Sequence, residues 1–287
     1  MKYLVTGGNG YIGSQLVEEL LKKGHEVSVL YRAGSYPHHV KNEILDQVTS
    51  YYYDGTAESL DSVVENIDAV FHLAALYNTR DDSDTVNKLV ESNIIYSTHL
   101  LQKLSERNPQ ATFVSTSTFS AYDKNGEYHP ATVYAATKKA VEVLAASFKV
   151  RSVFLTLPDT YGPNDWRVKV HNLASNTLKN GDTFSFNSPA DQKINLLHVR
   201  DVIRGLLKAS ELAATLELGS TRTYELFHPV NTITLSELAE ALVSHYKKGA
   251  LEFPLFGKIV EIPEGKNFLP GFTLTAHPIC DLPETLS

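Results

Sequence analysis

A tyrosine and a lysine four residues apart, Tyr134 and Lys138, are the pair in this sequence best suited to proton transfer. They lie in a helical pattern over residues 133–149, so their spacing puts both side chains on one face of the helix. A nearby ammonium favours the phenolate and brings the tyrosine pKa toward the working pH. In a reduction, Tyr134 would give its proton to a carbonyl oxygen as hydride reaches the carbon. The pair alone is a weak signal, because a plain helix surface can carry the same pattern.

A row of hydroxyl side chains, Ser115-Thr116-Ser117-Thr118, offers a group to hold that carbonyl oxygen. The predicted strand over 111–116 ends in this row, at the edge where ligands meet parallel sheets. Such hydroxyls also satisfy the backbone of turns, and we expect at least two of the four to do only that.

A glycine-rich turn over residues 6–13 predicts a dinucleotide site. It follows a predicted strand at 2–6 and opens a predicted helix at 11–23, a context that makes the pattern specific. Glycines spaced three apart allow a tight turn and close approach of a phosphate, with helix N–H groups facing the anion. A loop that merely needs flexibility is the alternative. The residues expected at the cofactor are Gly7, Asn9, Gly10, Tyr11, Ile12 and Gly13.

The end of the second predicted strand, over 26–31, decides between NAD and NADP. A carboxylate there holds both ribose hydroxyls and favours NAD, whereas an arginine pairs with a 2′-phosphate. The strand ends in Arg32, with Ser35 as support, which predicts NADP(H) and leaves NAD(H) as the alternative. Arg32 as a solvated surface residue is the other interpretation. Asp54, after the third strand, is placed either to accept from the adenine amino group or to cap a turn.

Strand-like and helix-like segments alternate through the first half of the chain, as they must to position these groups. This alternation predicts an α/β fold, a doubly wound parallel sheet with helices on both faces. The predicted strands cover 2–6, 26–31, 48–53, 69–73, 111–116 and 152–157, and the helices cover 11–23, 56–66, 84–107 and 133–149.

After residue 157 the pattern changes to a long loop with shorter elements. We expect helices at 168–180, 199–212 and 235–247, strands near 183–186, 193–198 and 222–228, and then an irregular tail. The predicted domains are a dinucleotide-binding domain over 1–157, with a return segment near 196–212, and a smaller interleaved substrate lobe over 158–195 and 213–287.

Composition is that of an ordinary globular protein, with 43% hydrophobic and 21% charged residues among 287. No apolar run approaches the roughly 18–20 residues that span a bilayer, and the first strand begins too early for a signal peptide. A net charge of −7 argues against nucleic-acid binding. The single cysteine, Cys280, excludes an internal disulfide and a cysteine-rich metal site. We therefore expect a cytoplasmic protein without a metal site.

Several markers occur in the order typical of the extended short-chain dehydrogenase/reductases, the sugar-nucleotide epimerase/dehydratase group. The chain resembles that family over nearly its whole length. The resemblance implies that Ala74, Asn93, Tyr134 and Lys138 lie at the cofactor, with Lys138 reaching the nicotinamide ribose. The markers are Thr6-Gly7, Gly10, Gly13, Asp54, His72-Leu73-Ala74-Ala75, Asn93, the hydroxyl row, Tyr134, Lys138, Tyr161-Gly162-Pro163 and His198-Val199-Arg200-Asp201.

The same resemblance implies which hydroxyl is catalytic. In the family it lies four residues before a tyrosine, here Tyr122, so Thr118 is expected to orient the ketone, with Ser117 as the fallback. Family dehydratases follow this hydroxyl with an Asp-Glu pair, whereas this chain has Phe119-Ser120, which argues against dehydration. Family epimerases hold NAD tightly and usually carry an acidic residue after the second strand, which is missing here.

Within the family the chain looks most like the sugar-nucleotide 4-ketoreductases of the CDP-abequose synthase type, through residues 134–138 and 159–169. That likeness implies NADPH-dependent reduction of the 4-keto group of a nucleotide-activated, CDP-linked deoxy sugar or deoxyheptose, as in O-antigen biosynthesis. A 4-epimerase with tightly bound NAD and a non-catalytic NADP-sensing regulator are the alternatives. A homodimer through helices 84–107 and 133–149 follows by family analogy. The expected substrate-binding residues are Ser117, Thr118, Arg167, Lys169, Asn172 and Lys193.

Overall fold

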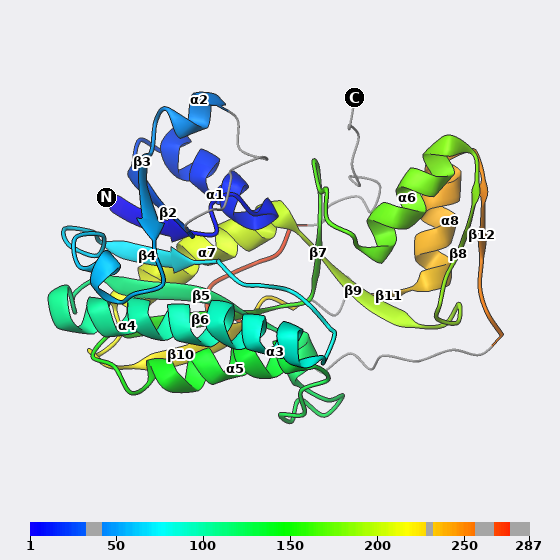
Figure 1. The fold of residues 1–287 in the computed structure, drawn as a ribbon. Coiled ribbons are helices and arrows are strands. Elements are labelled where there is room, and N and C mark those ends of the chain that lie inside the picture. The colour runs from blue at the N-terminus through cyan, green and yellow to red at the C-terminus, as the bar shows by residue number, and fades with distance from the viewer. Residues whose placement is uncertain (33–41, 228–231, 256–266, 276–287) are drawn as a thin grey trace.

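A parallel sheet of seven strands, in the order β10-β6-β5-β4-β1-β2-β3, is the largest element of the computed structural model (Figure 1). The structure describes residues 1–32, 42–227, 232–255 and 267–275. The strands are β1 (Lys2–Thr6), β2 (Glu26–Arg32), β3 (Thr49–Tyr53), β4 (Ala69–His72), β5 (Thr112–Thr118), β6 (Arg151–Leu157) and β10 (Thr221–Glu225). The strand order reverses between β1 and β4, where doubly wound sheets bind ligands beyond the carboxyl ends of their strands. The predicted fold class is confirmed.

Helices cover both faces of this sheet (Figure 1). On one face, α1 (Tyr11–Lys22) and α7 (Val199–Ala214) share an apolar cluster with β1 and β2. On the other face, α4 (Tyr96–Arg107) and α5 (Val133–Ala145) pack on β4 and β5. The helices bury apolar residues at helical spacing, for example Leu16, Val17 and Leu20 of α1 and Leu100, Leu101 and Leu104 of α4.

Several helix predictions need correction. The helix expected over 84–107 is divided into α3 (Ser83–Leu89), the π-helix η2 (Val90–Ile95) and α4, and the segment expected as a helix over 56–66 holds only the 3₁₀ turn η1 (Glu58–Leu60). In that second segment the helical spacing of buried Leu60, Val63 and Val64 is met by successive turns, which end at Asn66 in a left-handed conformation with φ 55°. A short helix, α2 (Asn42–Leu45), was not predicted.

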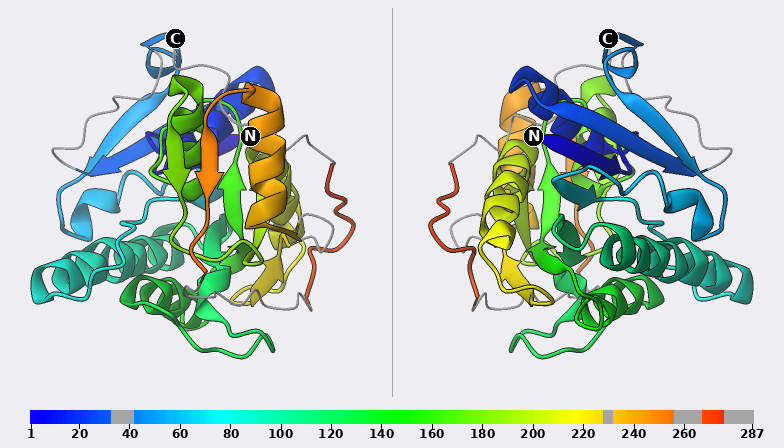
Figure 2. Two further views of the ribbon diagram at one scale, coloured as in Figure 1. Left: turned by 90° about the vertical axis from the view of Figure 1, so that its right-hand side faces the viewer. Right: turned by 90° about the vertical axis from the view of Figure 1, so that its left-hand side faces the viewer.

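A smaller lobe lies beside the carboxyl ends of the large sheet (Figure 2). It holds a three-stranded sheet of order β11-β9-β7 and a two-stranded sheet of order β12-β8. α6 ends at Gly181 with φ 83°, and α8 begins in a capping box between Thr234 and Glu237. The elements are β7 (Asp159–Tyr161), α6 (Val170–Asn180), β8 (Thr183–Ser185), β9 (Lys193–His198), β11 (Thr232–Thr234), α8 (Leu235–Tyr246) and β12 (Ala250–Glu252).

Strand pairing crosses the predicted domain division at two places. β10, from the part assigned to the substrate lobe, is an edge strand of the large sheet. β9, whose end lies in the predicted return segment, pairs with β7 and β11 of the small sheet. The two parts of the chain are interleaved more closely than the predicted boundaries imply.

The segment over residues 267–275 runs along β10 and α7. The Glu225 N–H donates to the carbonyl of the segment's first residue at 2.8 Å. Arg204 of α7 donates to the Thr275 hydroxyl at 2.6 Å, and the Thr275 N–H donates to Asp201 at 3.0 Å. This segment is therefore joined both to the sheet and to the helix that covers it. Among the described residues, no helix is long and apolar enough to cross a membrane.

Candidate active site

The turn after β1 brings the N-terminus of α1 to the switch point of the sheet. Gly7 has φ +70°, and a Cβ there would lie 2.7 Å from the Ala74 N–H nitrogen. A Cβ on Gly13 would lie 2.1 Å from the Gly7 carbonyl oxygen. Both positions therefore require glycine. α1 begins after Gly10, where no side chain caps the helix, so its first N–H groups suit an anion such as a pyrophosphate.

A cavity of about 140 Å³ opens between this turn and the carboxyl ends of β2 and β4. It lies where the sequence predicts the dinucleotide, and five predicted cofactor residues line it. The described lining residues are Gly7, Asn9, Gly10, Leu30, Tyr31, Arg32, Leu73, Ala74, Ala75, Ser92 and Tyr96. None of these carries a carboxylate, and Arg32 brings a positive charge. The glycine turn and the uncapped N-terminus of α1 beside this cavity fit the pyrophosphate of a dinucleotide.

Arg32 and Asp54 occupy different surroundings. Arg32 ends β2, and its Nη1 donates to the Ser92 hydroxyl at 3.4 Å across the cavity. Asp54 is exposed and accepts from the N–H and the hydroxyl of Thr56 at 2.9 and 2.7 Å, which holds its pKa below the ordinary value. Asp54 is absent from the described lining of the cavity, and it has the geometry of a turn cap. Ser35 lies outside the described residues.

Asn93, predicted at the cofactor, is buried in η2 and bonds the protein itself. Its Oδ1 accepts from the Leu76 N–H at 2.7 Å, and its Nδ2 donates to the Leu76 carbonyl and the Thr137 hydroxyl, both at 3.0 Å. Both amide hydrogens are thus used. Asn93 therefore holds the loop after β4 against α5.

Thr118 ends β5, directly before the 3₁₀ turn η3 (Phe119–Ala121). Its hydroxyl accepts from the Ser120 N–H at 3.3 Å and is hydrogen-bonded to the Ser120 hydroxyl at 2.9 Å. Ser115 likewise donates to a backbone carbonyl, that of His72, at 2.7 Å. The Ser117 hydroxyl is buried and has no hydrogen-bond partner among the described residues. Thr118 and Ser117 therefore lie together at the edge of the sheet, with only the second hydroxyl unpaired.

Tyr134 lies in the first turn of α5, and the structure corrects the predicted direction of its pKa. Burial, and then the nearby Tyr77, raise the pKa of Tyr134 to about 12. The sequence suggested that Lys138 would lower this pKa, but the cation that opposes the upward shift is Arg167. The phenol is therefore held in its protonated form, as a proton donor requires.

Lys138 is buried one helical turn after Tyr134. Burial lowers the pKa of Lys138 to about 8, against the opposing charge of Glu142. No hydrogen bond or ion pair of its ammonium is recorded among the described residues, which leaves its donors for a ligand hydroxyl. Burial, and then the positive charge of Lys138, lower the pKa of His72 to about 3. The imidazole therefore stays neutral between the hydroxyls of Thr6 and Ser97.

Tyr77 is a residue at this site that the sequence prediction missed. Its ring lies edge-on to the Tyr134 ring, with centroids 4.9 Å apart, and the Lys169 ammonium lies 5.1 Å from its centroid. Lys169 also pairs with Asp159 at 3.1 Å. The available signal was an aromatic residue two positions after the Ala74-Ala75 marker, which spacing alone does not distinguish from a surface tyrosine.

Arg167 lies near Tyr134, but most of its donors are used within the protein. It donates to both carboxylate oxygens of Asp165 at 2.7 Å and to the hydroxyl and carbonyl of Thr160 at 2.9 and 2.7 Å. Its guanidinium lies 4.2 Å from the centroid of the Tyr11 ring. Asn172 is buried and donates to the Arg167 carbonyl at 3.0 Å.

The remaining predicted residue, Lys193, begins β9 as an exposed side chain, paired across the strands with Thr234. Helix α5, which carries Tyr134 and Lys138, packs against β5, where Ser117 and Thr118 lie, and against η3. Ile12 follows Tyr11 in the first turn of α1 and packs against the apolar cluster. Among the described residues, no group of three or more His, Cys, Asp or Glu side chains could hold a metal ion.

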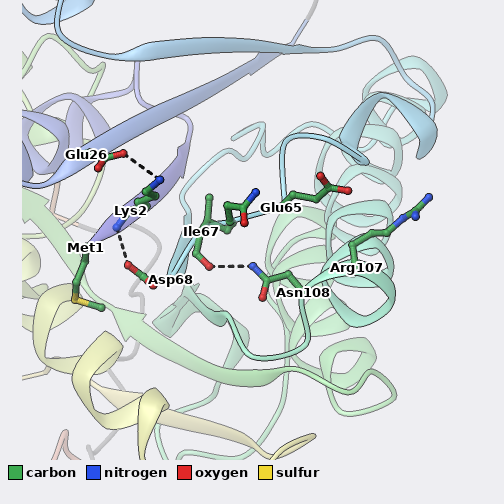
Figure 3. Close-up of a pocket in the computed structure, with 9 residues that line it drawn as sticks. Met1, Lys2, Glu26, Glu65, Ile67, Asp68, Arg107 and Asn108 are labelled. Atoms are coloured by element: carbon green, nitrogen blue, oxygen red, sulfur yellow. Dashed lines mark hydrogen bonds and ion pairs between the residues drawn. The ribbon is translucent and has the colours of Figure 1, made fainter.

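A larger recess, of about 710 Å³, lies at the opposite end of the sheet (Figure 3). Its lining comes from the amino ends of β1, β2 and β4 and includes the ion pair of Lys2 with Glu26 at 3.5 Å. None of the predicted site residues lies there. The candidate active site is the smaller cavity and the polar edge beside it.

Comparison with known proteins gives one family over most of the chain. The family model described as "NAD dependent epimerase/dehydratase family" matches residues 3–221. The CDP-abequose synthase of Yersinia pseudotuberculosis is 28% identical over 213 residues, which are 72% of each chain. An uncharacterized UDP-glucose epimerase of Bacillus subtilis is also 28% identical, over 259 residues and 81% of each chain.

Solved structures share the fold at low identity. The UDP-glucuronic acid 4-epimerase of Bacillus cereus, in complex with UDP-glucuronic acid and NAD, superposes with a TM-score of 0.80 at 21% identity, covering 98% of this chain and 96% of that one. MoeE5 in complex with UDP-glucose and NAD gives a TM-score of 0.80 at 20% identity, covering 98% and 97%. At these identities the likeness speaks to the fold alone.

Proposed function

The chain belongs to the NAD dependent epimerase/dehydratase family, and from this premise we propose that it reduces the 4-keto group of a nucleotide-activated deoxy sugar with NADPH. The observation that carries the proposal is the described lining of the cofactor cavity, which has Arg32 and no carboxylate. An arginine there suits the 2′-phosphate of NADP(H), whose reduced form serves reductions. We place the enzyme in the cytoplasm.

The turn over residues 6–13 and Arg32 would hold the dinucleotide, and Lys138 would donate to its nicotinamide ribose. NADPH supplies the hydride that reaches the keto carbon. Thr118, or Ser117 in its place, donates a hydrogen bond that orients the ketone oxygen. Tyr134, kept protonated by burial, gives its proton to that oxygen, which completes the alcohol and leaves a phenolate to be reprotonated. Because the hydride would reach only one face of the fixed ketone, the new stereocentre would have a single configuration.

The choice of a CDP-linked deoxy sugar or deoxyheptose is supported by the CDP-abequose synthase relative and by Phe119-Ser120 after Thr118. These two side chains offer no acid and base for eliminating water. Lys169, beside Tyr134 through Tyr77, is a donor for the substrate's diphosphate. Asn172 and Lys193 are weaker candidates for the same ligand, and Arg167 joins them because most of its donors are used within the protein.

The test supplies NADPH with 4-keto deoxy sugars linked to CDP, GDP, dTDP or UDP and follows the oxidation of NADPH. We expect turnover with the CDP ketone and loss of about a thousandfold in kcat for Tyr134→Phe, since acid catalysis typically contributes 10²–10⁴. Thr118→Val and Ser117→Ala identify the orienting hydroxyl by the larger loss. Arg32→Ala should weaken NADPH and leave NADH unchanged. A wild-type enzyme that oxidises no NADPH with any of these ketones contradicts the proposal.

A 4-epimerase with tightly held NAD is the second candidate, because the similar solved structures of MoeE5 and the Bacillus cereus enzyme contain NAD. Such an enzyme keeps its dinucleotide through purification and turns over a UDP-sugar without added reductant. Mass spectrometry of the purified chain separates the two functions.

We also propose a homodimer formed through α4 and α5. These helices pack side by side, and exposed apolar side chains, Val143 on α5 and Ile95 just before α4, offer contacts to a second copy. Sedimentation of the wild-type chain and of Val143→Lys tests this: the variant should shift toward the monomer.

A further inference from the structure

We propose that Tyr77 is a positioning residue of this site: its ring contacts both Tyr134 and Lys169, and so fixes the proton donor relative to the cation for the substrate's diphosphate. The inference deepens the proposed function and rests on it for the roles of Tyr134 and Lys169. Nothing in the sequence pattern marked Tyr77, and it acts through its two neighbours.

The backbone beside Tyr77 is held in place although its side chain is 60% exposed. The preceding residue, Leu76, is bonded through both its N–H and its carbonyl to the buried Asn93 at 2.7 and 3.0 Å. Asn93 is in turn bonded to Thr137 of α5, the residue before Lys138. A large aromatic ring is therefore presented to solvent from a fixed loop, at the edge where the candidate site lies.

The ring of Tyr77 makes two contacts of recognised attractive geometry. It meets the Tyr134 ring at 80° with centroids 4.9 Å apart, the edge-to-face arrangement that aromatic quadrupoles favour. The Lys169 ammonium lies 5.1 Å from its centroid, within cation–π range. Lys169 is steadied further by Asp159 at 3.1 Å.

The three residues come from separate parts of the chain. Tyr77 lies on the loop after β4, Tyr134 opens α5, and Lys169 precedes α6 of the smaller lobe. Tyr77 therefore joins the sheet domain to the smaller lobe beside the reacting groups. A shift of about 1 Å in such an arrangement can cost on the order of a hundredfold in rate.

Tyr77 also acts on the electrostatics of Tyr134. Its phenol is second to burial among the causes that raise the pKa of Tyr134 to about 12. Replacement of Tyr77 by leucine removes the ring that shields the phenol, whereas phenylalanine keeps the ring and both contacts. Comparison of Tyr77→Leu with Tyr77→Phe therefore separates the role of the ring from that of the hydroxyl.

The test is a double-mutant cycle of Tyr77→Leu and Lys169→Met, with Tyr77→Phe as the ring-retaining variant. Tyr52→Leu, at a tyrosine of 59% exposure on β3, is the matched control. We expect Tyr77→Leu to lower kcat/KM about 10–100-fold, through both kcat and KM, and to weaken calorimetric binding of CDP. Tyr77→Phe should restore most of both. The double variant should lose no more than the poorer single variant, and NADPH affinity should stay within about threefold throughout.

Additive losses in the cycle, or a Tyr77→Leu enzyme with wild-type kcat/KM and CDP affinity, overturn the inference. Calorimetry with CDP and UDP needs no turnover, so it reports on the Tyr77 bridge even if no ketone is reduced. Failure of the wild-type chain to bind either nucleotide also overturns the inference, because Lys169 then has no diphosphate to receive. Turnover together with an additive cycle leaves the proposed function standing and removes only the role of Tyr77.

Discussion

At the scale of single residues, the candidate site contains two titrating groups that burial shifts in opposite directions. The pKa of Tyr134 is raised to about 12, and that of Lys138 is lowered to about 8. The raised pKa keeps the Tyr134 phenol protonated, and so able to donate its proton, over the whole physiological pH range. The lowered ammonium pKa brings the loss of the Lys138 charge close to physiological pH. The alkaline limit of activity therefore belongs to the lysine.

We predict that kcat/KM for reduction is level below neutral pH and falls as pH rises through about 8. Protonated Lys138 is the form that attracts the ribose and the phosphates, so activity is present below its pKa and is lost above it. The measurement is a pH profile of kcat/KM, which reports groups of the free enzyme. Lys138→Arg, whose charge persists at high pH, should move the fall upward. A wild-type profile that stays level to pH 10 contradicts this assignment.

Sequence spacing was enough to predict candidate residues for this site, but not their environments. Gly7, Gly13, Tyr134 and Lys138 follow from spacing, since turn geometry and a helix face are local properties. The direction of the pKa shift of Tyr134 does not follow from spacing, because it depends on burial and on Tyr77, which lies on the loop after β4. The bonding of Arg167 to Asp165 and Thr160 likewise required the folded loop.

At the scale of secondary elements, α5 is joined to the loop that follows Thr118. Lys139 donates to the Tyr122 hydroxyl at 3.0 Å and to Glu142 at 2.7 Å. The buried Glu142 also accepts from Thr223 of β10 at 2.9 Å. Lys139, the residue next to Lys138, thus connects α5 to Tyr122 and, through Glu142, to the edge strand β10.

We predict that Lys139→Met lowers both stability and kcat. It leaves the Glu142 carboxylate buried without its cation, at a cost of roughly 1–3 kcal/mol of unfolding free energy. It also frees the Tyr122 loop, for which we expect a fall in kcat of about tenfold with NADPH affinity unchanged. Urea unfolding and steady-state kinetics measure the two effects. Tyr122→Phe, which keeps the ion pair, should reproduce only the kinetic loss. Unchanged urea unfolding of Lys139→Met would falsify the stability part.

The longer strands were predicted, whereas of the three-residue strands only β8 was, for a physical reason. The first six strands of the sheet lie within two residues of their predicted bounds, because each is rich in the β-branched, aromatic or aliphatic residues that favour strands. β7, β11 and β12 have three residues each, too few for a periodic pattern, and they exist through pairing with distant strands. The helix predicted over 56–66 was wrong for a different reason. Its apolar residues have helical spacing, but successive turns place them in the core without a helix.

At the scale of the whole molecule, the loop between β7 and α6 of the smaller lobe contacts α1 at Tyr11. The Tyr11 hydroxyl donates to the Pro163 carbonyl at 3.3 Å, and its ring lies edge-on to Trp166 at 5.7 Å. Arg167 covers the same ring at 4.2 Å while bonded to Asp165. Tyr11, the first residue of α1, is therefore enclosed by the loop between β7 and α6.

We predict that Arg167→Met raises KM for the sugar nucleotide about tenfold or more and changes NADPH affinity less than threefold. Asp165 holds Arg167 within its own loop, and the Arg167 guanidinium contacts Tyr11 of α1, so we expect its loss to displace this loop and not the dinucleotide cradle. Substrate kinetics and NADPH titration measure the two quantities.

Arg167→Lys distinguishes this role from direct binding of the diphosphate. Lysine keeps the charge but loses the bidentate bond to Asp165 and the flat contact with Tyr11, so the loop should be displaced nearly as fully as in Arg167→Met. If Arg167→Lys instead recovers a KM close to that of the wild type, the guanidinium serves mainly as a charge for the substrate.

The segment over 267–275 has a consequence for solubility. β10 is an edge strand of the large sheet, and an uncovered edge offers unpaired N–H and carbonyl groups to the edge of another molecule. The chain's own late residues occupy that side of β10, through the bond from Glu225 and the hold of Arg204 on α7. A version of the chain cut before residue 267 would lose this cover and gain a route to aggregation, even with every candidate catalytic residue in place.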